Sequence, residues 1–191
     1  MDFCVRADHN RNKAKVMSNL PQSPRVESAV LVPLYRRLDG DLRVVLIRRS
    51  NIGAHAGHLA LPGGKHEAED GSMLETALRE SYEEIGLRHD QVEILAELPP
   101  TDTRSTNFRI YPFPAKVIQP VVWQANEREV DEILDVSLAE LAAAEVSIEE
   151  APTDRQAPYY RVGEYRLWGA TYRLLSVLVP RLLAGEWDIE A

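Results

Sequence analysis

Cysteine and long hydrophobic runs are both scarce in this sequence of 191 residues. Cys4 is the only cysteine, so an intramolecular disulfide and a metal site built from several cysteines are both excluded. The longest apolar stretch, AVLVPLY at residues 29–35, is far too short to cross a membrane. The first twenty residues lack the apolar region of a secretory signal peptide. We therefore expect a cytoplasmic protein with no membrane partner.

Positive charge is also in the minority. Lysine and arginine number 22 against 30 aspartates and glutamates, which gives a net charge of −8. Nonspecific nucleic-acid binding requires neutralisation of many phosphates, so this balance argues against a nucleic-acid partner. A small phosphorylated ligand needs only a few local basic groups. The composition, 45% hydrophobic and 27% charged, is typical of a globular protein with a core.

The chain is predicted to consist of an N-terminal arm, residues 1–24, and one domain, residues 25–191. Residues 26–37 and 42–49 are rich in valine and leucine and flank the turn LDGD, which predicts a β-hairpin. Two further strands are expected over 92–99 and 108–118. The second strand contains two prolines, which favour an edge or bulged position in a sheet.

The C-terminal half predicts helices as well as strands. Residues 132–146 read as a strand end and a short helix with Ser137 as N-cap, and residues 158–187 read as a hairpin followed by a helix. The last helix is apolar on most of its circumference: Trp168, Tyr172, Leu174, Leu175, Val177, Leu178 and Val179. Burial in the core and contact with a second subunit in a homodimer are the two alternatives. The mixture predicts one layered α/β or α+β domain.

An acidic helix is predicted over residues 72–85. Ser72 and Glu75 form an S-x-x-E capping box at its start, and Gly86 is typical of a left-handed helix end. The apolar face is expected to comprise Leu74, Leu78, Ser81 and Ile85. The opposite side is expected to carry Thr76, Glu80, Glu83 and Glu84.

The carboxylates of this helix follow a double glycine. Glu80 and Glu84 are an i,i+4 pair of like charge, which costs helix stability. A solvated acidic face, on which water and salt screen the charges and keep that cost small, is the alternative to a functional site. The upstream segment LPGG, residues 61–64, predicts a tight turn whose backbone can approach a ligand closely. Carboxylates and a backbone carbonyl make an all-oxygen site, which suits Mg²⁺ or Mn²⁺ rather than Zn²⁺. Such ions neutralise phosphate oxygens and activate water.

This stretch resembles the signature of the Nudix hydrolases, G-x5-E-x7-R-E-U-x-E-E-x-G-U, where U is a bulky aliphatic residue. The matching positions are Gly64, Arg79, Glu80, Glu83, Glu84, Gly86 and Leu87. Ser81 stands at the first U, and one extra residue before Arg79 leaves no glutamate at the isolated E. The resemblance implies a Nudix fold, a mixed β-sheet sandwiched between α-helices, and metal-dependent hydrolysis of a pyrophosphate linkage in a nucleoside diphosphate derivative.

Within that family the chain is similar to the subgroup that hydrolyses coenzyme A. Residues 63–70 follow the frame GG-x-x-D-x-x-D with Glu67 at the first aspartate, and LIRRS and HAGHLALPGG resemble two upstream motifs. The arginine expected between those motifs is replaced by Gly53 or Ala54. The resemblance implies cleavage of coenzyme A or an acyl derivative to 3′,5′-ADP and a phosphopantetheine. ADP-ribose, NADH and dinucleoside polyphosphates are the alternative substrates.

The resemblance also implies roles for individual residues. Glu80 and Glu84 would be metal ligands, Glu83 a ligand directly or through water, and the carbonyl of Gly64 a further ligand. Arg79 would orient the carboxylates. The general base would be Glu83 beside a metal-bound water, or one of Glu127 and Glu129 in the segment NERE, with Glu129 favoured and a solvated turn as the alternative.

Basic side chains near the LPGG turn are candidates for holding substrate. Arg48, Arg49 and Lys65 would contact phosphate oxygens, although strand alternation allows at most one of the two arginines to point inward. His55 lies in the loop over the same site, where substrate binding and packing are both open. The polar segment 99–106 is compatible with a substrate lid and with an ordinary exposed loop.

Two functions of other classes remain. A noncatalytic nucleotide sensor of the same fold would be expected to lack some carboxylates, yet all three of the ExxEE pattern are present. An isopentenyl diphosphate isomerase would need a catalytic cysteine, and Cys4 lies in the arm.

Overall fold

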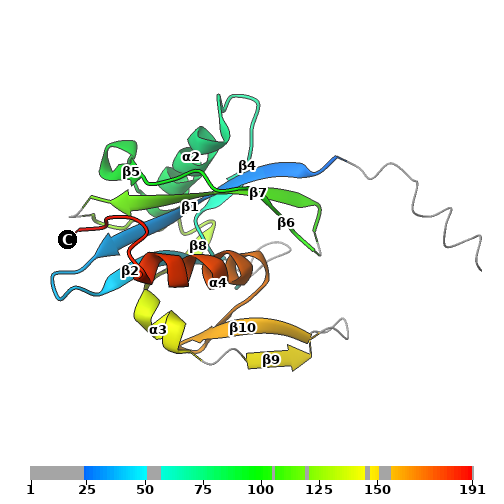
Figure 1. The fold of residues 1–191 in the computed structure, drawn as a ribbon. Helices are drawn as coiled ribbons and strands as arrows, with labels where there is room; N and C mark the ends of the chain where they lie inside the picture. The colour runs from blue at the N-terminus through cyan, green and yellow to red at the C-terminus, as the bar shows by residue number, and fades with distance from the viewer. Residues whose placement is uncertain are drawn as a thin grey trace, which may run out of the picture.

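The computed structural model describes residues 24–50, 57–104, 106–118, 121–144, 147–150 and 156–190. Within these residues, eight strands form one mixed sheet (Figure 1). They are β1 (Val26–Arg36), β2 (Leu42–Arg49), β3 (Leu59–Ala60), β4 (Gly63–Lys65), β5 (Val92–Ile94), β6 (Thr101–Asp102), β7 (Phe108–Val117) and β8 (Val130–Ser137). A smaller sheet contains β9 (Ser147–Glu150), β10 (Gln156–Val162) and β11 (Tyr165–Leu167). The helical elements are α2 (Met73–Ile85), the 3-10 turn η2 (His89–Gln91), α3 (Leu138–Ala143) and α4 (Gly169–Leu183).

The predicted hairpin is confirmed and forms the middle of the large sheet. β1 and β2 are antiparallel, with Leu34 opposite Val44, and Gly40 turns the chain between them at φ 88°. β1 also pairs with β4 on that side and, in parallel, with β7 on its other side. The strand-to-helix junction capped by Ser137 and the hairpin of β10 and β11 are confirmed as well.

The proline-containing strand was expected to be an edge or a bulged strand, and the edge position is wrong. β7 lies between β1 and the strands β5 and β6. Alternate residues of a strand direct their backbone groups to opposite neighbours, so Pro112 and Pro114 face the same side. On that side their carbonyls accept the N–H groups of Leu98 at 3.1 Å and Leu95 at 2.9 Å. The irregular segment that contains Leu95 and Leu98 only donates to β7, so it does not need the N–H groups that the prolines lack. Because this segment is irregular, the strand expected over 92–99 ends at Ile94.

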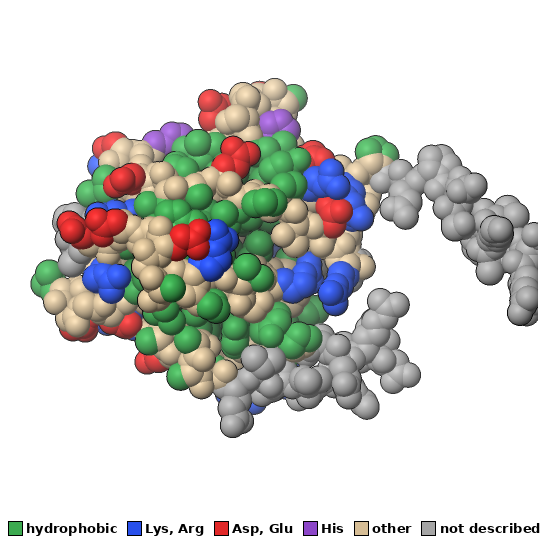
Figure 2. Space-filling view, in the orientation of Figure 1, with side chains coloured by type: hydrophobic (Ala, Val, Ile, Leu, Met, Phe, Trp, Pro, Cys, Tyr) green, Lys and Arg blue, Asp and Glu red, His purple; other side chains and the backbone are tan. Residues whose placement is uncertain are grey.

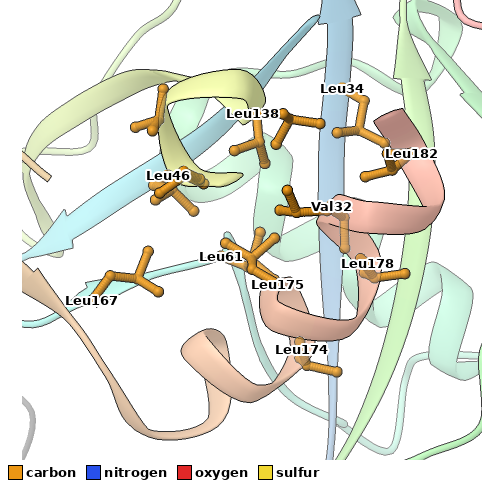
Figure 3. Close-up of a cluster of buried hydrophobic side chains, with 14 of the residues drawn as sticks. Val32, Leu34, Leu46, Leu61, Leu138, Leu167, Leu174, Leu175, Leu178 and Leu182 are labelled. Carbon is orange, nitrogen blue, oxygen red and sulfur yellow. The ribbon is translucent and has the colours of Figure 1, made fainter. Parts of the chain in front are cut away.

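Two hydrophobic cores lie on the two faces of the sheet. Alternation along β1 sends Ala29 and Leu31 to the face that α2 covers, and Val32 and Leu34 to the face of α3 and α4. Figure 3 shows the second core, in which leucines of α4 meet Val32 and Leu34. The predicted mixed sheet sandwiched between helices is therefore confirmed.

The apolar surface of α4 is divided between burial and exposure. The buried side chains are Leu174, Leu175, Leu178, Val179 and Leu182, as expected for a core helix. Val177 is 60% exposed and Trp168, at the N-cap, is 40% exposed. A homodimer that uses this exposed side stays a prediction. Apart from residue 24, the predicted arm lies outside the described residues, and none of the described helices is long and apolar enough to cross a membrane.

Candidate active site

Helix α2 is positioned by caps that the sequence encodes. The hydroxyl of Ser72 accepts the N–H of Glu75 at 3.2 Å, and Gly86 ends the helix at φ 71°. The Glu75 carboxylate accepts the N–H of Gly71 at 2.7 Å. The predicted limits of the helix are thus confirmed, and Glu75 closes the turn that precedes it.

The buried side of α2 differs from the expected one. Thr76 and Glu84 were placed on the outward side, but both are buried, whereas Leu74 and Leu78 are only partly buried. The buried positions are Thr76, Ala77, Ser81, Glu84 and Ile85. The small side chains among them let the helix approach the sheet closely, so residue size rather than hydrophobicity selects this side. Glu84 is carried into the protein as a result.

The double glycine packs directly against the carboxylates of α2. The carboxylate of Glu84 accepts the N–H of Gly63 at 2.8 Å. A Cβ atom at Gly63, whose φ is 149°, would lie 2.2 Å from the carbonyl oxygen of Ala29. A Cβ atom at Gly64 would lie 2.3 Å from the carboxylate carbon of Glu80. Glycine at these two positions therefore leaves room for the backbone of β1 on one side and for the Glu80 carboxylate on the other.

Burial makes the Glu84 carboxylate basic. The residue is 1% exposed, and desolvation raises the pKa of Glu84 to about 8, with further upward contributions from the nearby charges of Glu80 and Glu129. The N–H of Gly63 and the guanidinium of Arg49, 3.6 Å away, oppose this effect only in part. Desolvation also raises the pKa of Glu80. Two partly uncompensated acidic groups thus face one another.

This arrangement fits a hard divalent cation at two carboxylates. Glu80 and Glu84 supply oxygen donors beside the Gly63–Gly64 backbone, and a cation would relieve their mutual repulsion. Glu83 has a side chain that is 49% exposed and pairs with Arg79 at 3.1 Å instead of turning toward them. Among the described residues, accordingly, no three acidic, histidine or cysteine side chains converge as a ready-made metal site.

Arg79 links the loop before α2 to the carboxylates. It donates twice to Asp70, at 2.8 and 3.0 Å, and also to Glu80 at 3.0 Å. The backbone carbonyl of Lys65 accepts a further bond at 3.1 Å. These contacts hold the loop and the carboxylates in one network, so Arg79 acts here through other residues.

Asp70 is the partner of Arg79 that the sequence analysis did not single out. Its side chain is 5% exposed, and hydrogen bonds from Arg79 hold the pKa of Asp70 well below its usual range. The hydroxyl of Thr76 and the N–H of Glu67 also donate to it, at 2.8 and 3.0 Å. Its place in the GG-x-x-D-x-x-D frame was the available signal.

A cavity of about 470 Å³ opens beside Glu80 and Glu84. Its apolar wall comes from α4 and from strand residues of the core that α4 covers: Val30, Leu59, Leu61, Ile110 and Leu174. Charged side chains that also line it are Arg49, Lys65, Glu67, Arg104, Glu129 and Arg173. The cavity can therefore hold a molecule with both an apolar and an anionic part.

The predicted substrate-binding residues do not all reach this cavity. Arg49 and Lys65 line it. Arg48 does not, and it pairs instead with Asp131 at 3.0 Å and lies 5.4 Å from the ring centre of Tyr165. The two arginines alternate along β2, so they point to different faces. His55 lies outside the described residues.

The candidate general base Glu129 lies on the cavity wall, while Glu127 does not. The carbonyl of Glu129 accepts the N–H of Ser50 at 2.8 Å, which ties the segment to the end of β2. Thr103, Arg104 and Thr106, from the polar segment that was compatible with a lid, also reach the cavity. His58 lines it too and contacts Trp168 edge-on, with ring centres 4.8 Å apart.

Comparison with known proteins adds sequence relatives and similar folds. The NUDIX domain family matches residues 26–163. An uncharacterized Nudix hydrolase NudL of Enterobacter is 30% identical over 162 residues, which is 83% of each chain, and its namesake in Salmonella newport is 32% identical over 82% of each. A Yersinia enterocolitica NudL is 38% identical over 59% of this chain and 57% of its own length.

Solved structures show the same fold at low sequence identity. A Nudix hydrolase from M. Smegmatis, RenU, has a TM-score of 0.61 and 16% identity, and covers 89% of this chain and 92% of its own. The NUDIX domain of Shewanella oneidensis NrtR, solved with ADP ribose, has a TM-score of 0.57 and 18% identity over 89% and 98%. These two neighbours bear out the expected fold class.

Proposed function

The chain belongs to the Nudix hydrolase family, which acts on pyrophosphate bonds, and on that premise we propose that it hydrolyses coenzyme A or an acyl-coenzyme A to 3′,5′-ADP and a phosphopantetheine. One observation carries this proposal. The carboxylates of Glu80 and Glu84 lie against the Gly63–Gly64 turn at a cavity with an apolar wall and several basic side chains. A substrate that combines a pyrophosphate with apolar and further anionic parts suits such a cavity.

We assign each site residue a task that agrees with its surroundings. Glu80 and Glu84, with the Gly64 carbonyl and an outward Glu83 that can rotate, would hold Mg²⁺ or Mn²⁺. When bound, the ion supplies neutralisation of phosphate oxygens and activation of water. Arg79 orients Glu80 through the pairing described above.

The remaining residues act on substrate and water. Glu129 lines the cavity and accepts the proton of the attacking water, with Glu83 as the alternative base. Arg49 and Lys65 hold oxygens of the pyrophosphate. His55 keeps its predicted role as a binding residue, although it lies outside the described residues.

The test is an assay of the purified chain with Mg²⁺ and Mn²⁺ against coenzyme A, ADP-ribose, NADH and diadenosine polyphosphates, with products identified by mass. Production of 3′,5′-ADP from coenzyme A in preference to turnover of the others supports the proposal. Glu84→Gln should reduce kcat by about a hundredfold or more, because it removes an acidic oxygen of the site. Glu93→Gln, an exposed position of β5, is the matched control and should leave the rate unchanged.

Other outcomes lead to the alternatives. Preference for ADP-ribose, the ligand of the NrtR domain, or for NADH or a dinucleoside polyphosphate would replace coenzyme A while keeping the chemistry. Absence of turnover with both ions, together with nucleotide binding, would indicate a noncatalytic sensor.

A further inference from the structure

Two guanidinium groups share the wall of the cavity without a carboxylate partner. Arg104, which follows β6, and Arg173, in α4, both line it. Within the described part of the chain, neither makes an ion pair, and Arg173 donates only to the backbone carbonyl of Asp102 at 3.3 Å. Partial burial and the charge of Arg104 both lower the pKa of Arg173. Two positive charges that lie close together without a carboxylate partner repel each other, and a bound anion would relieve that repulsion.

The carboxylate of Asp102, whose backbone carbonyl Arg173 contacts, already has other partners. The carboxylate of Asp102 pairs with Arg25 at 3.2 Å and with Arg109 at 2.9 Å. Two arginines thus share the Asp102 carboxylate, and Arg173 contacts only the backbone of Asp102, in a chain whose net charge is −8. Figure 2 shows basic side chains gathered at the side of the molecule where β6 and the start of β7 lie in Figure 1. Such a local excess of positive charge attracts anionic ligands.

The strand order separates these arginines from the acidic end of the cavity. At the level of Ser28, β1 pairs with Lys65 of β4 on one side and with Ile110 of β7 on the other, and Ile110 pairs with Thr101 of β6. Three steps between adjacent strands of about 4.8 Å place β6 about 14 Å from β4. A pyrophosphate at the carboxylates, next to Gly64, therefore lies on β4, three strand positions away from the strand that precedes Arg104.

We propose that Arg104 and Arg173 bind a phosphomonoester of the substrate that is separate from the scissile pyrophosphate. This inference rests on the proposed function, in which the pyrophosphate lies at Glu80 and Glu84. Two guanidinium groups can neutralise the two charges of a phosphomonoester and donate to its oxygens in pairs. In coenzyme A that group is the phosphate on the ribose, which ADP-ribose and NADH lack. Arg104 and Arg173 would then determine specificity rather than take part in bond cleavage.

Paired substrates test this assignment. The wild type, an Arg104→Gln/Arg173→Gln variant and Arg173→Lys are compared on coenzyme A and on 3′-dephospho-coenzyme A. The kcat/KM of the wild type should be higher for coenzyme A than for 3′-dephospho-coenzyme A by about tenfold or more. A factor of that size is what one good charge-assisted hydrogen bond contributes. The double variant should lose that preference through a higher KM for coenzyme A alone, and Arg173→Lys should keep part of it. Arg181→Gln, on the same helix and paired with Glu186, is the charge-matched control.

Binding separates failure of this inference from failure of the proposed function. Calorimetric titration of the wild type and the double variant with 3′,5′-ADP and with 5′-AMP needs no turnover. Tighter binding of 3′,5′-ADP by the wild type alone supports the phosphate subsite even if coenzyme A is not a substrate. Equal affinity of the wild type for both nucleotides, or an equal preference in the double variant, would overturn the inference, whether or not the enzyme hydrolyses coenzyme A.

Discussion

Glu84 shows how burial changes the proton affinity of a single carboxyl group. It accepts one backbone N–H and lies 3.6 Å from one arginine, and otherwise it is enclosed by the protein. A carboxyl group in such surroundings holds its proton to a higher pH than in water. The consequence is a site that favours a proton or a cation at neutral pH.

The pH dependence of stability follows from this shift. The folded pKa of Glu84 is about 8 and lies above the unfolded value of 4.5, so the unfolded chain loses the proton first as pH rises. In the presence of EDTA, the free energy of unfolding should therefore fall between pH 4.5 and 8, by up to about 5 kcal/mol. Urea titrations of the wild type and Glu84→Gln measure the difference. Identical pH slopes in the two proteins would contradict this account.

Gly63 is a second residue for which the surroundings set the outcome. Gly63→Ala would put a Cβ atom against the backbone of β1, which cannot move aside, so we expect a loss of about 3 kcal/mol or more in the free energy of unfolding. Gly40→Ala is the control: its φ is also positive, but nothing lies within 4 Å of the added atom, so only about 1 kcal/mol of backbone strain is expected. Chemical denaturation compares them, and equal losses would show that strain, and not contact, governs Gly63.

At the scale of elements, the decisive junction is between α2 and the loop that precedes it. Asp70 in that loop receives bonds from Arg79 and Thr76 of the helix, and Arg79 in turn reaches Lys65 at the end of β4. Three elements are therefore held by one buried carboxylate and one arginine. This junction determines where Glu80 lies.

Removing the charge of Asp70 should loosen the junction. Asp70→Asn leaves Arg79 without its bidentate partner, and we expect a loss of about 2 kcal/mol in the free energy of unfolding at pH 7. The folded pKa of Asp70 is lowered, so its stabilisation is present above pH 4 and is lost as pH falls further. The gap between the two proteins in urea titrations should thus close in acid. Asp90→Asn, which affects an exposed pair with Arg88, should change nothing at either pH.

At the scale of the whole molecule, charge is distributed unevenly around one cavity. Carboxylates lie together at the double glycine, and arginines from distant parts of the sequence lie together near β6. A ligand that binds both regions would connect the sheet with α4. Binding of a cation at the acidic region alone should already stabilise the fold by mass action.

A thermal shift measures that stabilisation. Saturating Mg²⁺ or Mn²⁺, at about 100 times Kd, should contribute about 2.7 kcal/mol. For a domain of this size that corresponds to a rise in Tm of about 5–10 °C. A Glu80→Gln/Glu84→Gln variant should lose the rise, whereas Glu93→Gln should retain it. A rise of the same size in all three proteins would place the cation elsewhere.

Local signals in the sequence sufficed for much of the fold. Ser72 and Gly86 delimit α2, Gly40 closes the first hairpin and Ser137 starts α3, because caps and turns depend on hydrogen bonds and dihedral angles within a few residues. The same local pattern of glycines and glutamates singled out Glu80 as a candidate ligand. Site roles taken from that pattern remain predictions.

Only the tertiary structure decided which side of a helix is buried and which strands lie next to one another. The burial of Glu84 depends on how closely small side chains let α2 approach the sheet, and the central position of β7 depends on an irregular neighbour that needs no N–H from its prolines. The meeting of Arg104 and Arg173 at one cavity and the ion pair of Arg25 with Asp102 join residues far apart in the sequence. Such contacts have no local signature, because they follow from packing across the whole sheet.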